Sequence, residues 1–244
     1  MTNRNKIYLH VGLEKTGSTS FQNSLRCAVT KNNQRIYFDG ASNQFFTASF
    51  LQSIDKNNRW TKKTLQRRSR DQFYNFVAFL KCNIDKDIIL TSEHLSGRLD
   101  YLDIKDLLAT LTVSHEVVVI LVLRDQSSWL KSKYKEALKN GFSSSFDKYC
   151  EMNEYDLWSR VDFNQIVDDR RRGSEENADL KIVKYSENII KDLAKIVNIE
   201  LPNTHVRKNV SGHRWKYLLI QKLNRLQVTR LGMLRRMLLK FLFR

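Results

Sequence analysis

The chain alternates between two kinds of hydrophobic pattern. One consists of short runs of β-branched and aliphatic residues, which are typical of buried strands. These runs begin at Ile7 and at Leu180 and also cover 88–90 and 117–123. The other places apolar residues three or four positions apart, as at Phe21, Leu25 and Ala28, which is typical of a helix with one buried face. The run 117–123 is apolar throughout, so it belongs in a parallel sheet that helices cover on both faces. The sequence therefore predicts an α/β fold, a three-layer sandwich with a central parallel sheet.

The segments between these strands predict further helices and one irregular excursion. A helix over about 64–82 would bury Phe73, Phe76, Val77 and Leu80. A second helix follows the run 117–123 and ends at Asn140-Gly141, a good stop signal, and a third begins near Asn188. Residues 40–63 are polar and aromatic without a clear period, and we expect them to face the substrate.

Composition favours a single domain. The 244 residues include one proline and eight glycines, which leaves little material for linkers. We expect residues 1–212 to form the α/β domain and 213–244 to form a basic helical segment. There is no signal-peptide pattern and no apolar stretch long enough to span a membrane. The three cysteines, Cys27, Cys82 and Cys150, lack metal-ligand or disulfide spacing, so we expect reduced thiols in a cytoplasmic protein.

The formal net charge of +16 exceeds what one nucleotide ligand would require. Much of it lies in residues 213–244, which contain no acidic residue and in which leucines and other apolar residues interleave with the basic ones. This pattern predicts a basic amphipathic helix or helix pair. The helix either docks on the domain or lies on an anionic membrane surface, as a peripheral contact at the inner face of the membrane. No nucleic-acid reader motif accompanies the charge, so no nucleic-acid partner is expected.

The strand that begins at Ile7 runs into a turn whose hydroxyl-rich end opens a helix. Because N–H groups at a helix N-terminus have no partner inside the helix, this turn can offer them to an anion. The residues that would form this phosphate-binding loop are Thr16, Gly17, Ser18, Thr19 and Ser20. The nucleoside-triphosphate loop, G-x-x-x-x-G-K-[ST], carries its lysine after the second glycine. Here Ser18 occupies that position and Lys15 precedes Gly17, so the usual triphosphate and metal geometry is not expected.

A second candidate anion site follows the run 117–123. Arg124 would emerge at the carboxyl end of that strand, where parallel sheets bind their ligands. Ser132 comes eight residues later, in the helix that follows. A guanidinium offers a rigid, always-charged fork to a phosphate, and a hydroxyl adds a directional donor.

Together these two motifs resemble the PAPS-dependent sulfotransferases, which transfer a sulfuryl group from 3′-phosphoadenosine 5′-phosphosulfate. Lys15 to Thr19 matches the family's 5′-phosphosulfate loop, and the run from His10 to Gln22 is similar to the bacterial carbohydrate-type branch. The resemblance implies that Arg124 and Ser132 bind the 3′-phosphate and that PAPS is the donor. It also implies an acceptor hydroxyl on a carbohydrate, in a surface polysaccharide or glycolipid. No metal is implied, because no Asp/Glu/His cluster accompanies the loop.

The resemblance extends more weakly to two later segments. Tyr185 resembles the family's tyrosine close to the adenine. Arg207 and Lys208 partly resemble a loop that closes over the 3′-phosphate, although Asn209 stands where the family has glycine. For these two basic residues a plain surface role is an equal alternative.

Sulfuryl transfer needs a base for the acceptor hydroxyl and a cation for the leaving phosphate. We assign the second role to Lys15. The candidates for the base are Glu93 and His94, which follow the run 88–90, and strand alternation predicts that one of the two faces the cleft. His10 is a third candidate, but a histidine inside the first strand is more often a hydrogen-bonded core residue.

Two other functions compete with this interpretation. A small-molecule kinase would share the α/β phosphate loop, but the lysine after Gly17 is missing and no aspartate ends the run 117–123. A non-enzymatic protein could use its basic C-terminal segment to bind membranes or polyanions. In that case deletion of 213–244 would abolish all function.

Overall fold

The computed structural model describes residues 4–13, 15–29, 35–37, 47, 50–51, 72–95, 99–153, 162–201 and 214–225. Its contacts divide the chain into two compact units. The first unit comprises Met1–Arg124 with Asp162–Val206, and the second comprises Asp125–Val161 with Arg207–Arg244. The predicted division between residues 212 and 213 stays a prediction.

A parallel sheet forms the centre of the first unit. Its five described strands lie in the order β2-β3-β1-β4-β5, and every neighbouring pair is parallel. The strands are β1 (Lys6–His10), β2 (Arg35–Tyr37), β3 (Asp87–Thr91), β4 (Glu116–Leu123) and β5 (Asp179–Lys184). Leu9 of β1 is in register with Leu90 on one side and Val119 on the other. Since all strands run in one direction, their carboxyl ends meet at one edge of the sheet, which is where α/β folds bind ligands.

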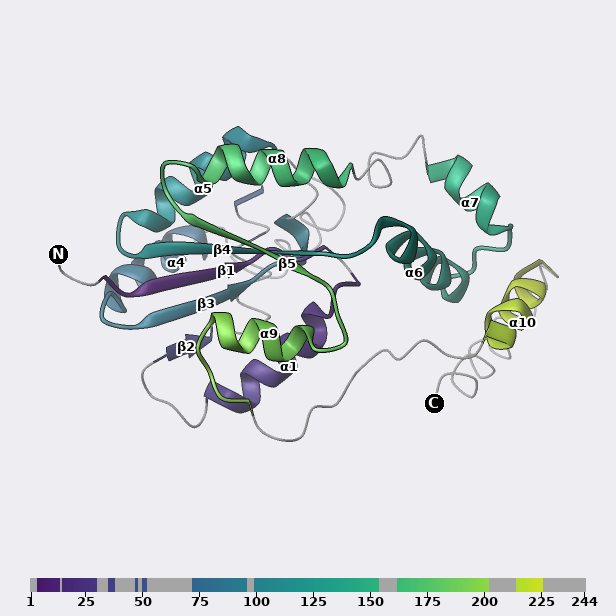
Figure 1. Cartoon of the computed structure of the whole chain (residues 1–244), viewed down its shortest axis with the longest axis horizontal. Coiled ribbons are helices and arrows are strands. Elements are labelled where there is room, and N and C mark those ends of the chain that lie inside the picture. Colours follow the sequence, from purple (N-terminus) through teal and green to yellow (C-terminus); the bar gives the residue numbers. More distant parts are fainter. Residues whose placement is uncertain are drawn as a thin grey trace. The chain divides into compact units, whose positions relative to one another are not determined.

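Helices cover both faces of this sheet. They are α1 (Ser18–Val29), α4 (Gln72–Cys82), α5 (Tyr101–Thr112), α8 (Phe163–Ser174) and α9 (Ile189–Ile196), with a short 3₁₀ helix, η1 (Glu93–Leu95). Figure 1 shows α1 and α9 on one face and α5 and α8 on the other. The predicted three-layer α/β fold is therefore confirmed.

The hydrophobic pattern of the sequence accounts for the packing of these layers. On one face Tyr8 and Ile120 of the sheet pack with Phe21 and Leu25 of α1 and with Leu193 of α9. Phe21, Leu25 and Leu193 are each 0% exposed, so the predicted buried stripe of α1 is confirmed. Burying side chains of this size stabilises the fold by about 1.5–3 kcal/mol each.

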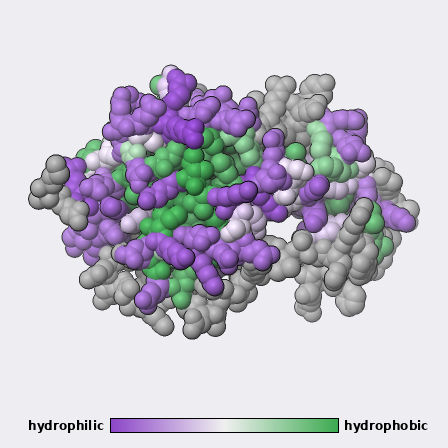
Figure 2. All heavy atoms as spheres, viewed as in Figure 1, coloured by the Kyte–Doolittle hydropathy of each residue, from purple (hydrophilic) through white to green (hydrophobic). Residues whose placement is uncertain are grey.

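The last strand of the order, β5, has one sheet neighbour and is partly exposed. It pairs with β4 alone among the described strands, and its Ile182 is 41% exposed. Figure 2, in the same view as Figure 1, shows a band of hydrophobic atoms between hydrophilic surfaces. Edge strands of this kind commonly carry charges that limit pairing with other chains, and Lys181 and Lys184 fit that pattern.

Most predicted elements lie close to their observed positions. The run 117–123 is β4, and the helix predicted over 64–82 is observed from Gln72, where Phe76 and Leu80 are buried. Residues 64–71 lie outside the described part of the chain. So does the predicted excursion over 40–63, apart from Thr47, Phe50 and Leu51.

The described helices of the second unit are α6 (Gln126–Lys139), α7 (Phe146–Asn153) and α10 (Arg214–Arg225). The Asp125 side chain caps α6 by accepting a hydrogen bond from the Ser128 N–H at 2.8 Å. The Tyr134 ring of α6 contacts the ring of Phe146, at 5.4 Å between centroids, and that of Tyr149, at 5.5 Å. These contacts join α6 to α7; the Tyr134–Phe146 pair has the edge-to-face geometry that aromatic rings prefer, and the Tyr134–Tyr149 pair is tilted by 55°.

Helix α10 packs against α6 and settles part of the question about the basic C-terminal segment. Tyr217 and Ile220 are 6% and 1% exposed and cluster with Leu138. The Asn224 amide donates to the Leu138 carbonyl at 2.8 Å. The apolar stripe of α10 thus docks on protein, whereas Leu218, at 52%, is exposed. Residues 226–244 lie outside the described part, and none of the described helices is long and apolar enough to cross a membrane.

Candidate functional site

The connection from β1 to α1 is a tight loop at the carboxyl edge of the sheet. Two of its residues have left-handed backbone conformations, Lys15 with φ 67° and Gly17 with φ 86°. The first helical hydrogen bond runs from the Phe21 N–H to the Gly17 carbonyl at 3.0 Å. The N–H groups of Ser18 and its next two neighbours therefore begin the helix without intrahelical acceptors, and such groups bind anions. A left-handed lysine is uncommon and costs about 1–2 kcal/mol, so the surrounding structure must hold it in place.

The hydroxyl groups of the loop differ in what they do. Thr16 is 0% exposed, and its hydroxyl donates to the Leu13 carbonyl and lies 3.5 Å from the Ser18 hydroxyl. Ser18 and Ser20 are also buried, at 2% and 6%, whereas Thr19 is exposed. Thr16 thus stabilises the turn through a buried hydrogen bond to its main chain. The predicted anion contacts of these hydroxyls stay predictions.

Arg124 joins the two motifs that the sequence singled out. It follows β4 directly, and its Nη1 donates a hydrogen bond of 2.9 Å to the Lys15 carbonyl, 109 positions away in sequence. Its guanidinium also lies 4.8 Å from the centroid of the Tyr185 ring. Its Nε–H is buried and has no acceptor within the described part of the chain. A buried N–H without a protein acceptor is rare and calls for a ligand, a water or strain to explain it.

Tyr185 completes this cluster from the other side of the loop. Its N–H donates to the Leu123 carbonyl at 2.6 Å, which extends the pairing of β5 with β4 by one residue. A Cβ added to Gly17 would lie 3.6 Å from the Tyr185 ring and 3.3 Å from Ile189. Gly17 therefore has a left-handed φ, and a side chain at this position would also lie close to Ile189 and the Tyr185 ring. Arg124 thus contacts both Lys15 and Tyr185, and Gly17 lies beside the Tyr185 ring, all at the carboxyl edge of the sheet. The predicted roles of these residues in nucleotide binding stay predictions.

His10 is buried beneath the loop at the end of β1. It is 1% exposed, and neither ring nitrogen has a hydrogen-bond partner among the described residues. Burial lowers the pKa of His10 to about 4, so the ring is neutral at physiological pH. Its ring meets that of Phe21 edge-on at 5.5 Å. The expectation of a core histidine is thus confirmed, but the expected hydrogen bond is not found among the described residues.

Glu93 and His94 follow β3 but do not continue its strand. β3 ends at Thr91, and both residues belong to the 3₁₀ helix η1. The argument that strand alternation points them in opposite directions was therefore wrong, because alternation applies only to extended backbone. Glu93 is half-buried, and the side chain of His94 lies outside the described part.

Three predicted nucleotide ligands are not tested by the described structure. Ser132 is half-buried on α6, in the second unit. Arg207 and Lys208 lie outside the described residues. Their predicted contacts with the 3′-phosphate stay predictions.

Two polar residues hold elements together in ways to which sequence reasoning assigned no role. Gln22 of α1 donates to the Thr91 hydroxyl at 2.7 Å and ties that helix to β3. Arg170 of α8 is 1% exposed and donates to main-chain carbonyls at the end of η1 and just beyond it. No pattern revealed it, because Arg170 stands in a run of three consecutive arginines that is typical of a solvated helix face. Within the described residues, no three His, Cys, Asp or Glu side chains form a group that could hold a metal.

No protein-family model and no curated protein matches the sequence. Among solved structures, the chain is similar to a sulfotransferase from Alicyclobacillus acidocaldarius, with a TM-score of 0.54 and 14% identity. The likeness covers 94% of this chain and 95% of that one. It shows that the two chains share a fold.

Two further structures are more distant. One is the sulfotransferase domain of the olefin synthase from Synechococcus PCC 7002, with a TM-score of 0.43 and 11% identity over 83% of this chain and 76% of that one. The other is retinol dehydratase in complex with androsterone and the inactive cofactor PAP, with a TM-score of 0.36 and 13% identity over 90% and 63%. Of these three likenesses, only the first has a TM-score above 0.5, and it shows a shared fold.

Proposed function

We propose that this protein is a sulfotransferase that moves a sulfuryl group from PAPS to a hydroxyl of a carbohydrate acceptor. The observation that carries the proposal is the hydrogen bond from Arg124 to the Lys15 carbonyl. It joins two motifs that the sequence related to opposite ends of one nucleotide, on a fold shared with a sulfotransferase.

The residues around the loop suit a donor with phosphate groups at two positions. The 5′-phosphosulfate would lie on the amides of residues 16–20 and near Lys15, since a helix N-terminus and a cation both favour anions. Arg124 has a buried Nε–H without a protein acceptor in the described part, and with Ser132 it would bind the 3′-phosphate. Tyr185 would lie close to the adenine, and Arg207 with Lys208 would close over the 3′-phosphate.

The reaction requires one proton transfer and the exchange of one bond to sulfur. Glu93, or His94 in its place, would accept the proton of the acceptor hydroxyl as its oxygen bonds to sulfur. Lys15 would stabilise the negative charge on the phosphate oxygen as the bond from that oxygen to sulfur breaks. The products are a sulfate ester and adenosine 3′,5′-bisphosphate, and the step needs no metal.

The carbohydrate acceptor follows from the sequence resemblance, which also suggests a surface polysaccharide or a glycolipid. The formal net charge of +16 is compatible with a polyanionic acceptor. Membrane contact through the C-terminal segment would rest on residues 226–244, because α10 uses its apolar stripe to dock on α6.

Transfer of radiolabelled sulfur from PAPS to a panel of polysaccharides and glycolipids tests the proposal. Lys15→Ala should reduce turnover by about 10²–10³-fold, the usual effect of losing one group that stabilises transition-state charge. Of Glu93→Gln and His94→Ala, the variant that removes the base should lose about 10²–10⁴-fold. Absence of sulfur transfer to any acceptor, together with Mg²⁺-dependent phosphoryl transfer from ATP, would replace the sulfotransferase with the kinase.

A further inference from the structure

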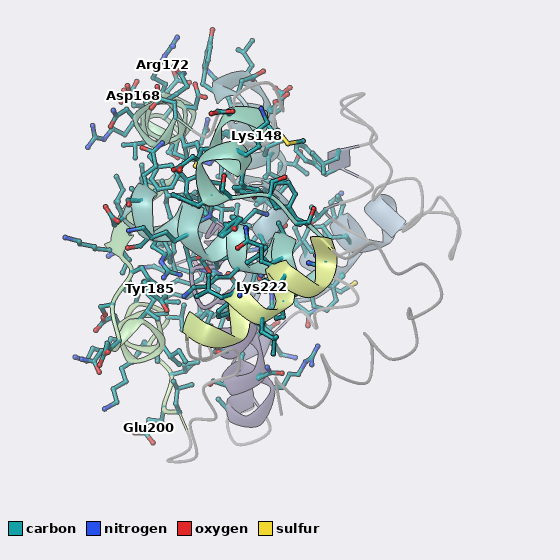
Figure 3. All side chains as sticks on the ribbon, turned by 90° about the vertical axis from the view of Figure 1, so that its right-hand side faces the viewer. Lys148, Asp168, Arg172, Tyr185, Glu200 and Lys222 are labelled. Carbon is teal, nitrogen blue, oxygen red and sulfur yellow. The ribbon has the colours of Figure 1, made fainter. Side chains whose placement is uncertain are left out.

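Arg170 is buried where its neighbours in sequence are exposed. It is 1% exposed, whereas Arg171 and Arg172 are exposed on the same helix, α8. Figure 3 shows Arg172 and Asp168 at the outer side of this helix. Buried arginines are rare unless they are paired or hydrogen-bonded, so the position of Arg170 requires an explanation.

The guanidinium spans two main-chain carbonyls of another segment. Nη2 donates to the Leu95 carbonyl at 2.7 Å, and Nη1 donates to the Leu99 carbonyl at 3.1 Å. Leu95 is the last residue of η1, two positions after Glu93, and its side chain is 0% exposed. Arg170 therefore holds the backbone at the far end of the 3₁₀ helix that carries the candidate base.

The near end of the same helix is fixed by the sheet. The Ser92 N–H donates to the His10 carbonyl at 2.9 Å, and the Ser92 hydroxyl lies 2.8 Å from the Thr47 hydroxyl. Glu93 thus lies between one anchor in the sheet and a second anchor in α8.

Arg170 stays charged although it is buried. Burial lowers the pKa of Arg170 to about 10, while Asp169, Asp103 and Asp100 oppose that shift, so the group stays charged at neutral pH. Taking such a charge out of water costs several kcal/mol, so a buried arginine is not needed for stability alone. Because this buried guanidinium donates hydrogen bonds to two carbonyls, we interpret its role as fixing one arrangement of the backbone. Lysine could reach one carbonyl but lacks the planar fork that spans both.

We infer that Arg170 is a positioning residue that fixes the η1 segment, and with it Glu93, for proton abstraction from the acceptor. This inference rests on the proposed function for the role of Glu93, but the contact between Arg170 and the segment does not depend on it.

The test compares four variants of the full chain. Arg170→Met removes both hydrogen bonds, and Arg170→Lys keeps the charge without the fork. Arg171→Met removes an exposed arginine from the adjacent position. Leu108→Ala, in the buried face of α5, lowers stability and leaves both hydrogen bonds of Arg170 in place. Amide hydrogen exchange in the peptides that contain residues 92–95 measures how well the segment is fixed, and steady-state kinetics measure kcat and the KM for PAPS.

Arg170→Met should raise exchange in these peptides at least tenfold and lower kcat by about tenfold to a hundredfold, with little change in the KM for PAPS. Arg170→Lys should have an exchange rate and a kcat between those of Arg170→Met and the unsubstituted chain. Arg171→Met and Leu108→Ala should leave kcat unchanged while both remain folded.

The inference is overturned if Arg170→Met and Arg170→Lys match Leu108→Ala in both kcat and exchange. If the unsubstituted chain transfers no sulfur, the proposed function fails, and the exchange measurement still decides whether Arg170 fixes the segment. If Arg170→Met does not fold, Arg170→Lys decides both questions.

Discussion

Replacing Arg124 with methionine should loosen the loop before any ligand binds. Methionine keeps an unbranched stem that can lie against the Tyr185 ring, but it cannot donate a hydrogen bond. The variant therefore removes the 2.9 Å bond to the Lys15 carbonyl and the charge that lies 4.8 Å from the Tyr185 ring. The left-handed Lys15 then loses the hydrogen bond that Arg124 makes to its carbonyl.

The magnitude follows from these two contacts. A hydrogen bond from a charged donor contributes about 1.5–3 kcal/mol, and a cation–π contact at a partly exposed site about 0.5–1 kcal/mol. Their loss lowers the free energy of unfolding by about 2–4 kcal/mol. For a protein of this size each kcal/mol shifts the melting temperature by roughly 2–4 °C, so Tm should fall by roughly 4–16 °C.

Thermal unfolding followed by calorimetry without nucleotide measures this loss. Arg172→Met is a matched control, because Arg172 lies over the Tyr101 ring at 3.9 Å but on an exposed helix face. It should lose no more than about 1 kcal/mol. If Arg124→Met melts at the same temperature as the unsubstituted chain, Arg124 does not hold the loop and the reasoning fails.

Two other predictions concern the backbone and the histidine beneath the loop. Gly12→Ala would place a Cβ 2.8 Å from both His10 Nε2 and Thr16 Oγ1, so the loop must shift. The affinity for adenosine 3′,5′-bisphosphate should then fall at least tenfold. An affinity equal to that of the unsubstituted chain would contradict the close packing of Gly12 against these two side chains. Because burial lowers the pKa of His10 from 6.5 to about 4, the unfolded chain takes up a proton between these pH values that the folded chain does not. This group should therefore lower stability by up to about 3 kcal/mol as pH falls from 6.5 to 4. Urea unfolding at both pH values should show a smaller loss for His10→Gln, and an identical loss would contradict the burial of a neutral ring.

The parts of the fold that the sequence predicted are those set by local pattern. The apolar run of β4 and the stripe of Phe21 and Leu25 on α1 follow from periodicity alone. A strand buried on both faces must be apolar throughout, whereas a helix buried on one face must be apolar every three or four residues. The loop was recognisable for a related reason. The left-handed φ of Gly17 and the helix start at Ser18 depend on residues that are adjacent in sequence.

The parts that the sequence did not predict depend on distant partners. No local signal distinguishes Arg170 from Arg171, because its burial is decided by carbonyls 71 and 75 positions away. The 3₁₀ turn at Glu93 is likewise fixed by tertiary hydrogen bonds from Ser92 and Arg170. Arg124 was predicted to bind phosphate, but its hydrogen bond to Lys15 required the three-dimensional order of β1 and β4.

Calorimetric titration with adenosine 3′,5′-bisphosphate, with and without Mg²⁺, tests the central claim most directly. The site built from Lys15 and Arg124 predicts one bound nucleotide per chain, with the same affinity in either condition. Lys15→Ala and Arg124→Met should each weaken binding at least tenfold. No binding by the unsubstituted chain, binding that requires Mg²⁺, or unchanged affinity in both variants would contradict it.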